Sequence, residues 1–182
     1  MAKSLKHTFI LWLIFVFFAL GLYLYIFKPY GRTGPDIGKV SVGETAPEIE
    51  LTSIDGKKSK LSDYRGKAVF LNFWASWCNP CKAELPDIQE MSRRMDANAF
   101  VVVAVSVDTT GADKLKEFLN DRGISFPVYL DPTMTAAKRY GVTGFPETFI
   151  LDKKGVIVKR YVGPREWTSR SMLDIFKGLA AE

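Results

Sequence analysis

The sequence holds a single histidine and only two cysteines, which excludes several kinds of chemistry. The histidine is His7, and no other imidazole is present to activate a serine or a cysteine, so Ser-His and Cys-His hydrolase mechanisms are excluded. A closed zinc site takes about four ligands, and Cys78 and Cys81 supply two, so it would need carboxylates or a second chain. Lys82 directly follows Cys81 and breaks the Cys-x-x-Cys-His pattern of haem attachment.

Beyond the first thirty residues, the chain also lacks an excess of charge of one sign. The formal net charge is +5, but Lys3, Lys6 and Lys28 belong to that first segment, which has no acid. The rest of the chain carries 22 basic and 20 acidic residues. Because no run of five or six basic residues forms a strip that could follow phosphates, we expect no nucleic acid among the partners.

The first thirty residues differ in composition from the rest. From Phe9 to Phe27 the chain has nineteen residues without a charge, which as a helix would span a hydrocarbon core of about 30 Å. We therefore predict a membrane anchor over residues 1–30, with a transmembrane helix at about 9–27. The alternative is a cleaved signal peptide, but its apolar core would be about 7 to 15 residues long and followed by a small-x-small site. The sequence here offers no such site: "YLYIFKPYG".

Charge does not decide the orientation of this anchor, because basic residues flank it on both sides. They are Lys3 and Lys6 before it, and Lys28, Arg32 and Lys39 after it. Two other arguments place the large domain outside the cytoplasm. A short tail before a first apolar segment resembles a signal anchor, and a cysteine pair that cycles through a disulfide suits a compartment where disulfides persist.

Beyond the anchor, a linker rich in glycine and proline covers residues 31–41, and a folded domain is predicted over 42–182. Two short extended stretches around Asp55 and Gly56 predict a β-hairpin at the start of this domain. Two later apolar runs lack strict alternation, which indicates strands buried on both faces: "KAVFLNFWAS" and "AFVVVAVSVD".

Between those two runs, apolar residues recur at helical spacing, so the segment predicts a strand-helix-strand unit. The recurring residues are Leu85, Ile88, Met91 and Met95. Helices near 113–121 and 133–140, a short strand near 125–128, two strands joined through 153–155 and a closing amphipathic helix complete the pattern. We therefore predict an α/β fold in which helices cover both faces of a mixed sheet.

The cysteine pair lies where a buried strand passes into a helix. Pro80 is in the first turn of that helix, where proline is favoured. Cys78 then lies near the free N–H groups and positive dipole end of the helix, which favour the thiolate. We predict that Cys78 is the attacking sulfur and Cys81, one turn deeper, the resolving sulfur of a redox-active disulfide. The alternative is a structural disulfide, but closing so small a loop removes little entropy from the unfolded chain.

Trp77 precedes the first cysteine, a proline precedes the second, and Pro86 follows it by five residues, in the segment "FWASWCNPCKAELP". This segment resembles the active site of the thioredoxin superfamily. Two flanking segments are similar to the membrane-anchored TlpA/ResA/CcmG (DsbE) group of thiol-disulfide oxidoreductases: "VGETAPEIELTSIDGKKSKLSDYRGK" and "GISFPVYLDPTMTAAKRYGVTGFPETFILDKKG". The resemblance implies a thioredoxin fold with an N-terminal β-hairpin extension and a central βα insertion.

The same resemblance implies roles for further residues. Pro146 matches the cis-proline of the family, so the Phe145–Pro146 bond would be cis and lie against the sulfurs; a trans proline in a loop is the alternative. The backbone of Phe145 would pair with an extended substrate. Glu84, on the same side of the helix as Cys81, resembles an acidic residue that tunes the thiol pKa and transfers protons. Its alternative is an exposed glutamate paired with a lysine.

Glu147 is similar to a residue of the CcmG branch and would add an acidic rim to the site. Together with Phe145, the other residues expected to bind substrate are Trp77, Asn79 and Pro80. Asn72 stands where thioredoxin itself has a buried aspartate, so the proton-accepting role of that aspartate is not carried over and Glu84 is the better candidate. No cofactor and no metal are implied.

The resemblance implies an enzyme that reduces disulfides in protein partners from the periplasmic side of a bacterial cytoplasmic membrane. The expected partner is the Cys-x-x-Cys-His pair of apocytochrome c, and the expected electron donor is a transmembrane thiol carrier of the CcdA/DsbD type. One alternative is a disulfide-forming oxidase with the same two cysteines. A peroxiredoxin-like peroxidase would need Pro and Thr where Leu71 and Ala75 stand. A redox sensor without turnover is the third alternative.

Overall fold

A computed structural model describes residues 12, 16–18, 20–23 and 40–182 of the chain. It divides the chain into two compact units, Met1–Asp36 and Ile37–Glu182. The described residues of the first unit are helical. Within the described residues, no helix has both the length and the apolar character needed to cross a membrane. The predicted transmembrane helix and linker lie largely outside the described residues, so both stay predictions.

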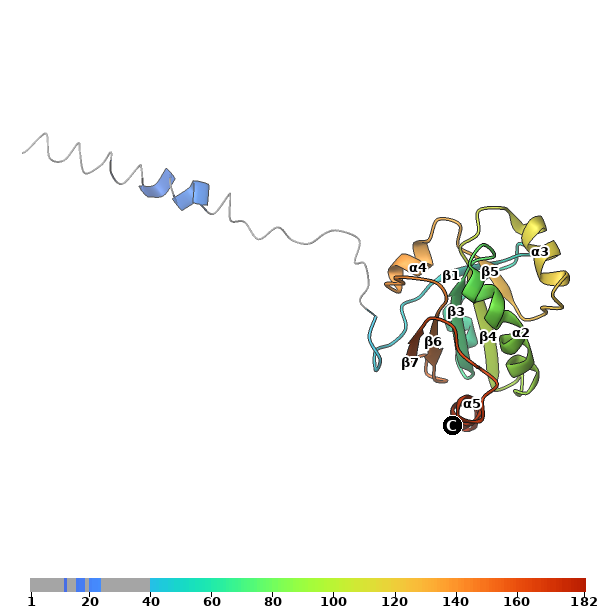
Figure 1. Ribbon diagram of the computed structural model, residues 1–182. Coiled ribbons are helices and arrows are strands. Elements are labelled where there is room, and N and C mark those ends of the chain that lie inside the picture. Colours follow the sequence, from blue (N-terminus) through green and yellow to red (C-terminus); the bar gives the residue numbers. More distant parts are fainter. Residues whose placement is uncertain (1–11, 13–15, 19, 24–39) are drawn as a thin grey trace, which may run out of the picture. The chain divides into compact units, whose positions relative to one another are not determined.

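The second unit is built on one seven-stranded mixed sheet with the order β2-β1-β5-β4-β3-β6-β7 (Figure 1). The strands are β1 (Glu50–Ser53), β2 (Lys58–Lys60), β3 (Ala68–Trp74), β4 (Phe100–Ser106), β5 (Val128–Leu130), β6 (Glu147–Leu151) and β7 (Ile157–Val162). The helices are η1 (Leu61–Tyr64), α2 (Asn79–Arg93), α3 (Ala112–Asn120), α4 (Thr135–Arg139) and α5 (Arg170–Ala181). The predicted α/β class with a mixed sheet is confirmed.

Strands β1 and β2 form the predicted hairpin at one edge of this sheet. They are antiparallel, with Leu51 opposite Ser59. Gly56 in the turn has a φ of 79°, a conformation that glycine adopts without the steric cost that other residues meet. Because β1 also pairs antiparallel with β5, the hairpin extends the sheet beyond the strands that carry the cysteines.

Strands β3 and β4 run parallel through the middle of the sheet. Their register runs from Ala68 opposite Phe100 to Trp74 opposite Ser106. Every residue of β3 is buried, which explains why its sequence shows no alternation of polar and apolar residues. The parallel register brings the carboxyl ends of both strands together, so the loops after Trp74 and Ser106 lie next to each other at the carboxyl end of β3 and β4.

Side chains of β3 point alternately to the two faces of the sheet. The Phe70 ring packs edge-on against Trp167 and Phe176, with ring centroids 4.8 and 5.9 Å apart. Phe73 points the other way and packs against Tyr140, which directly follows α4, at 5.4 Å. Helix α5 and the end of α4 therefore cover opposite faces of the sheet.

Two elements begin later than the sequence predicted. The short strand expected near 125–128 is displaced to β5, which starts immediately after Pro127, a residue without an N–H to donate to a neighbouring strand. Helix α4 starts two residues late, because the Asp131 carboxylate accepts the N–H groups of Thr135 and Ala137 at 2.8 and 2.9 Å. A local side-chain contact sets this boundary.

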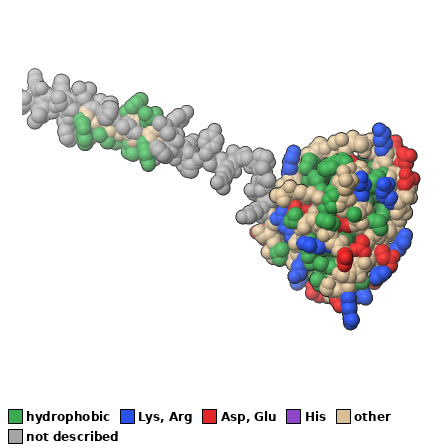
Figure 2. Space-filling view, viewed as in Figure 1, with side chains coloured by type: hydrophobic (Ala, Val, Ile, Leu, Met, Phe, Trp, Pro, Cys, Tyr) green, Lys and Arg blue, Asp and Glu red, His purple; other side chains and the backbone are tan. Residues whose placement is uncertain are grey.

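The surface of the second unit mixes charges of both signs. On the face that Figure 2 shows, Lys and Arg side chains are interspersed with Asp and Glu. Large hydrophobic side chains that are exposed in this unit include Val42, Trp77 and Val162. Of these, Trp77 directly precedes Cys78 in the chain.

Candidate active site

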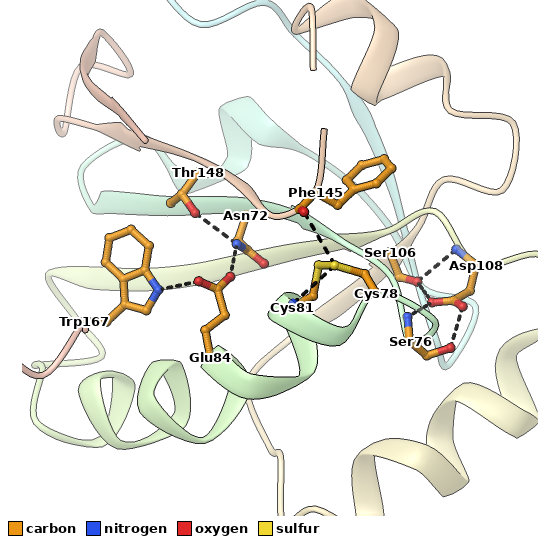
Figure 3. The surroundings of a disulfide bond; sticks show 10 residues. All are labelled: Asn72, Ser76, Cys78, Cys81, Glu84, Ser106, Asp108, Phe145, Thr148 and Trp167. Atoms are coloured by element: carbon orange, nitrogen blue, oxygen red, sulfur yellow. Dashed lines mark hydrogen bonds between the residues drawn. A yellow bond between two sulfur atoms is a disulfide. The ribbon is translucent and has the colours of Figure 1, made fainter. Parts of the chain in front are cut away.

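Cys78 and Cys81 form a disulfide at the start of α2 (Figure 3). Cys78 is the N-cap residue of the helix, and Pro80 lies in its first turn. The N–H of Cys81 donates to the Sγ atom of Cys78 at 3.2 Å. Since the free N–H groups and the dipole of a helix N-terminus favour negative charge, this position stabilises a thiolate on Cys78 when the disulfide is reduced.

The two cysteines differ in their access to a partner. The exposed fraction of Cys78 is 6%, whereas Cys81 is completely buried. Three exposed residues adjoin Cys78 in the chain: Trp77, Asn79 and Pro80. A disulfide of another protein can therefore reach Cys78 but not Cys81, which fits the attacking and resolving roles expected of them.

The peptide bond between Phe145 and Pro146 is cis, the conformation that the resemblance implied. The carbonyl oxygen of Phe145 lies 3.6 Å from the Sγ atom of Cys78 (Figure 3). The Phe145 ring packs edge-on against the exposed ring of Trp77, with centroids 5.9 Å apart. The backbone before the cis bond thus lies next to the Sγ atom of Cys78, the sulfur expected to react with a partner.

Glu84 is buried behind Cys81, with an exposed fraction of 4%. Its Oε1 atom accepts a hydrogen bond from Asn72 Nδ2 at 3.1 Å, and its Oε2 atom accepts one from Trp167 Nε1 at 3.0 Å (Figure 3). Burial raises the pKa of the Glu84 carboxyl to about 7, although these two hydrogen bonds act in the opposite direction. The alternative of an exposed glutamate paired with a lysine is wrong. A carboxyl group that titrates near neutrality can accept or donate a proton during thiol chemistry.

Comparison with known proteins agrees with this geometry. The model of the AhpC/TSA family matches residues 42–160. The chain belongs to the AhpC/TSA family. It is 37% identical over 128 residues to the thiol-disulfide oxidoreductase ResA of Bacillus thuringiensis (strain Al Hakam), which covers 70% of this chain and 73% of that relative. It is 39% identical over 126 residues to ResA of Geobacillus thermodenitrificans (strain NG80-2), which covers 68% and 71%.

A solved structure supports the fold of this AhpC/TSA family member. The crystal structure of a thiol:disulfide interchange protein, a thioredoxin family protein from Chlorobium tepidum TLS, superimposes with a TM-score of 0.61 at 30% identity. The match covers 77% of this chain and 98% of that one. The thioredoxin fold is confirmed, and the chain is a thiol-disulfide oxidoreductase of the TlpA/ResA/CcmG type.

The acidic rim that we expected from Glu147 is wrong. Its carboxyl group is fully buried, with Oε1 2.5 Å from Arg160 Nε and Oε2 accepting the N–H of Thr143 at 3.1 Å. Strand alternation is the reason. The side chain of Thr148, the next residue of β6, points to the Glu84 side of the sheet, where its hydroxyl oxygen accepts a hydrogen bond from Asn72, so Glu147 points to the opposite face.

The ion pair of Glu147 supports the loop that carries the cis bond. Arg160 also donates from its second terminal nitrogen to the carbonyl oxygen of Gly141 at 3.1 Å. The contacts at Gly141 and Thr143 both lie in the segment just before Phe145. Glu147 therefore acts in this oxidoreductase as an internal support and is not exposed to a substrate.

Sequence reasoning missed a second buried carboxylate beside the cysteines, Asp108. It accepts hydrogen bonds from the backbone N–H and the hydroxyl of Ser76, at 2.8 and 2.6 Å, and from the Ser106 hydroxyl at 2.6 Å (Figure 3). Because Ser76 is two residues before Cys78, these hydrogen bonds of Asp108 fix the loop that leads to Cys78, the expected attacking residue. The sequence signal that could have found it was the position of Asp108 at the end of the second predicted strand, "AFVVVAVSVD".

Trp167 was also missed as a partner of Glu84, and no feature of the sequence pointed to it. The two residues are 83 positions apart, and Trp167 lies in an irregular segment. As to metal, the described part of the chain contains no group of three or more His, Cys, Asp or Glu side chains that could hold an ion. We assign no residue to a cofactor.

Proposed function

We propose that this oxidoreductase reduces disulfides of protein partners on the extracytoplasmic side of a bacterial cytoplasmic membrane. One observation carries the proposal. A single reachable sulfur, on Cys78, is backed by a buried resolving sulfur and by a buried carboxyl group with a pKa of about 7. This arrangement suits attack by one sulfur and a proton transfer that accompanies its resolution by the other.

The reaction begins with the reduced enzyme. The Cys78 thiolate attacks one sulfur of the partner's disulfide, a mixed disulfide forms, and the second partner sulfur leaves as a thiolate that takes up a proton. Cys81 then loses its proton to Glu84 and attacks the Sγ atom of Cys78. The Cys78–Cys81 disulfide forms as the bond between Cys78 and the partner breaks, and the partner sulfur leaves as a thiolate that takes up a proton. The partner is thus released as a dithiol that has gained two electrons.

The surroundings of Cys78 supply the contacts for a partner. The carbonyl oxygen of Phe145 lies beside the sulfur, where an extended peptide can pair with it through its own N–H. Trp77, exposed by 63%, offers an apolar surface next to this position. Asn79 and Pro80 complete the exposed first turn of α2 and keep their predicted role in binding.

Each turnover leaves the enzyme oxidised, so a donor of two electrons must reduce Cys78–Cys81 again. We propose a transmembrane thiol carrier of the CcdA/DsbD type for this step. The uncharged run from Phe9 to Phe27 supports attachment to the same membrane. The proposed partner is the oxidised Cys-x-x-Cys-His pair of apocytochrome c, in agreement with the resemblance to the TlpA/ResA/CcmG group.

A trapping experiment tests the mechanism. In the full chain, Cys81→Ser removes the resolving sulfur, so we expect a stable mixed disulfide between Cys78 and a peptide that carries an oxidised Cys-x-x-Cys-His pair. Cys78→Ser is the matched control and should trap nothing. Absence of any adduct with Cys81→Ser, or equal trapping through Cys81 in the control, would contradict the assignment of the two sulfurs.

The equilibrium potential separates a reductase from an oxidase. Titration of the full chain against glutathione should give about −210 mV or below for a reductase. A value near −120 mV, about that of the oxidant DsbA, would make the enzyme a disulfide-forming oxidase on the same scaffold.

A further inference from the structure

Trp167 connects the C-terminal part of the chain to the redox site. It lies between β7 and α5 and has no exposed surface. Its ring packs against Phe70, Tyr161 and Phe176, while its indole N–H points at the Glu84 carboxyl group (Figure 3). A fully buried tryptophan thus directs its only polar atom at the group that we propose to exchange protons with Cys81.

Asp87 holds this tryptophan in place from the next turn of α2. Its carboxylate accepts hydrogen bonds from the backbone N–H of Trp167, from the backbone N–H of Thr168 at 3.1 Å, and from the Thr168 hydroxyl. The segment that carries Trp167 is therefore joined to α2 at two successive turns, once through Glu84 and once through Asp87.

The two side chains that contact Glu84 differ in what they can do. An indole N–H can only donate, so it stabilises the ionised carboxylate and offers nothing to a protonated one. The Asn72 amide can donate or accept. Its Oδ1 atom has no hydrogen-bond partner in the described structure, and after a turn of the amide it would accept from protonated Glu84. Of these two side chains, only Trp167 therefore discriminates between the two protonation states of Glu84.

We propose that Trp167 is a positioning residue of the redox site, which holds the Glu84 carboxyl group beside Cys81 and favours its ionised form, and that Asp87 holds Trp167. This inference rests on the proposed role of Glu84 in the reaction. It assigns to a segment beyond β7 a part in the chemistry of two cysteines at the start of α2.

Few other groups compete with Trp167 for control of Glu84. On α2, Asp87 is a nearby negative charge that raises the pKa of Glu84, and Cys81 becomes a titratable thiol after reduction. In the segment that carries Trp167, the backbone of Arg165 forms a hydrogen bond that lowers the pKa of Glu84. Asn72 on β3 and Thr148 on β6 are neutral. Removal of the indole N–H should therefore raise the pKa of Glu84.

The decisive variant is Trp167→Phe, which removes the N–H and keeps an aromatic ring. We expect the midpoint of the Glu84 titration, followed by carboxyl 13C NMR on the oxidised full chain in detergent, to rise by about one pH unit, a tenfold change in acidity. Phe176→Leu is the matched control, because it disturbs the packing of Trp167 without removing a donor. An unchanged midpoint in Trp167→Phe, or an equal rise in the control, would overturn the inference.

A second measurement leaves Trp167 intact and so remains informative if Trp167→Phe does not fold. The indole Nε1–H resonance of Trp167 should shift with pH at the midpoint of Glu84, and Glu84→Gln should abolish that shift. A resonance that does not respond to the ionisation of Glu84 would mean that no functional hydrogen bond exists, and the inference would be wrong.

Kinetics separate a failure of this inference from a failure of the proposed function. The rate at which the reduced enzyme resolves a mixed disulfide is measured against pH. If Glu84→Gln removes the inflection near pH 7 and Trp167→Phe moves it upward, both proposals stand. If only Glu84→Gln changes the profile, the role of Trp167 is wrong and that of Glu84 stands. If Glu84→Gln leaves the profile unchanged, the role of Glu84 is wrong, and the inference fails with it.

Discussion

Glu84 and Glu147 are two buried glutamates on opposite sides of the sheet next to the redox site, and they have different kinds of partners. Glu84 receives hydrogen bonds from two neutral side chains, Asn72 and Trp167. Glu147 forms an ion pair with Arg160. A buried carboxyl group with neutral donors remains able to take up a proton near pH 7, whereas one beside a guanidinium is suited to hold structure together. The residue type is the same, and the partner decides its use.

The largest expected effect concerns the Glu147 side of this comparison. Arg160→Met keeps an unbranched side chain but leaves the buried Glu147 without its cation. We expect the free energy of unfolding, measured by urea denaturation, to fall by about 3 to 5 kcal/mol at pH 7. Arg94→Met is the control, because its ion pair with Glu90 is exposed and should contribute at most about 0.5 kcal/mol. Similar losses of unfolding free energy in both variants would show that the buried Glu147–Arg160 pair stabilises the fold no more than an exposed ion pair does.

The next effect concerns the stability cost of Glu84. Its pKa is about 7 in the folded chain and 4.5 as an ordinary glutamate. Below pH 4.5 both states are protonated and there is no penalty. As pH rises from 4.5 to 7, the unfolded chain ionises first, so the folded chain loses stability relative to it, by about 3 kcal/mol in total.

Glu84→Gln should be free of this loss. The difference in unfolding free energy between the natural chain and the variant should therefore shift by about 3 kcal/mol, against the natural chain, between pH 4.5 and 7. Glu90→Gln is the matched control, because the Glu90 side chain lies on the exposed side of the same helix and forms only an exposed ion pair with Arg94. A difference for Glu84→Gln that does not change between pH 4.5 and 7, or that equals the control, would mean that burial does not raise the pKa of Glu84.

The smallest effect concerns the neutral partners of Glu84. Thr148→Val keeps the shape of the side chain but removes the hydroxyl that accepts from Asn72 Nδ2 at 3.0 Å. We expect a loss of about 1 kcal/mol in unfolding free energy with nearly the same dependence on pH as the natural chain, because Asn72 still reaches Glu84. A large change in that pH dependence would instead place Thr148 among the groups that control the Glu84 proton.

Much of the fold followed from patterns that are local in the sequence. The continuous apolar run of β3 predicted a strand buried on both faces, and the turn at Gly56 predicted the hairpin. The spacing of Cys78 and Cys81 placed both sulfurs on the first turn of one helix. Such features depend on residues a few positions apart, and the backbone geometry of a strand, turn or helix converts that spacing directly into position.

Only the tertiary structure decided which distant side chains meet at the site. Trp167 reaches Glu84 across 83 positions, and strand alternation turned Glu147 away from the surface where the resemblance had placed it. The sequence by itself determined the two sulfurs and the helix that carries them, and it predicted their order of attack. The partners of each buried carboxyl group depended on strand register and on the packing of α5 against the sheet, because contacts between distant segments form only when the whole core is assembled.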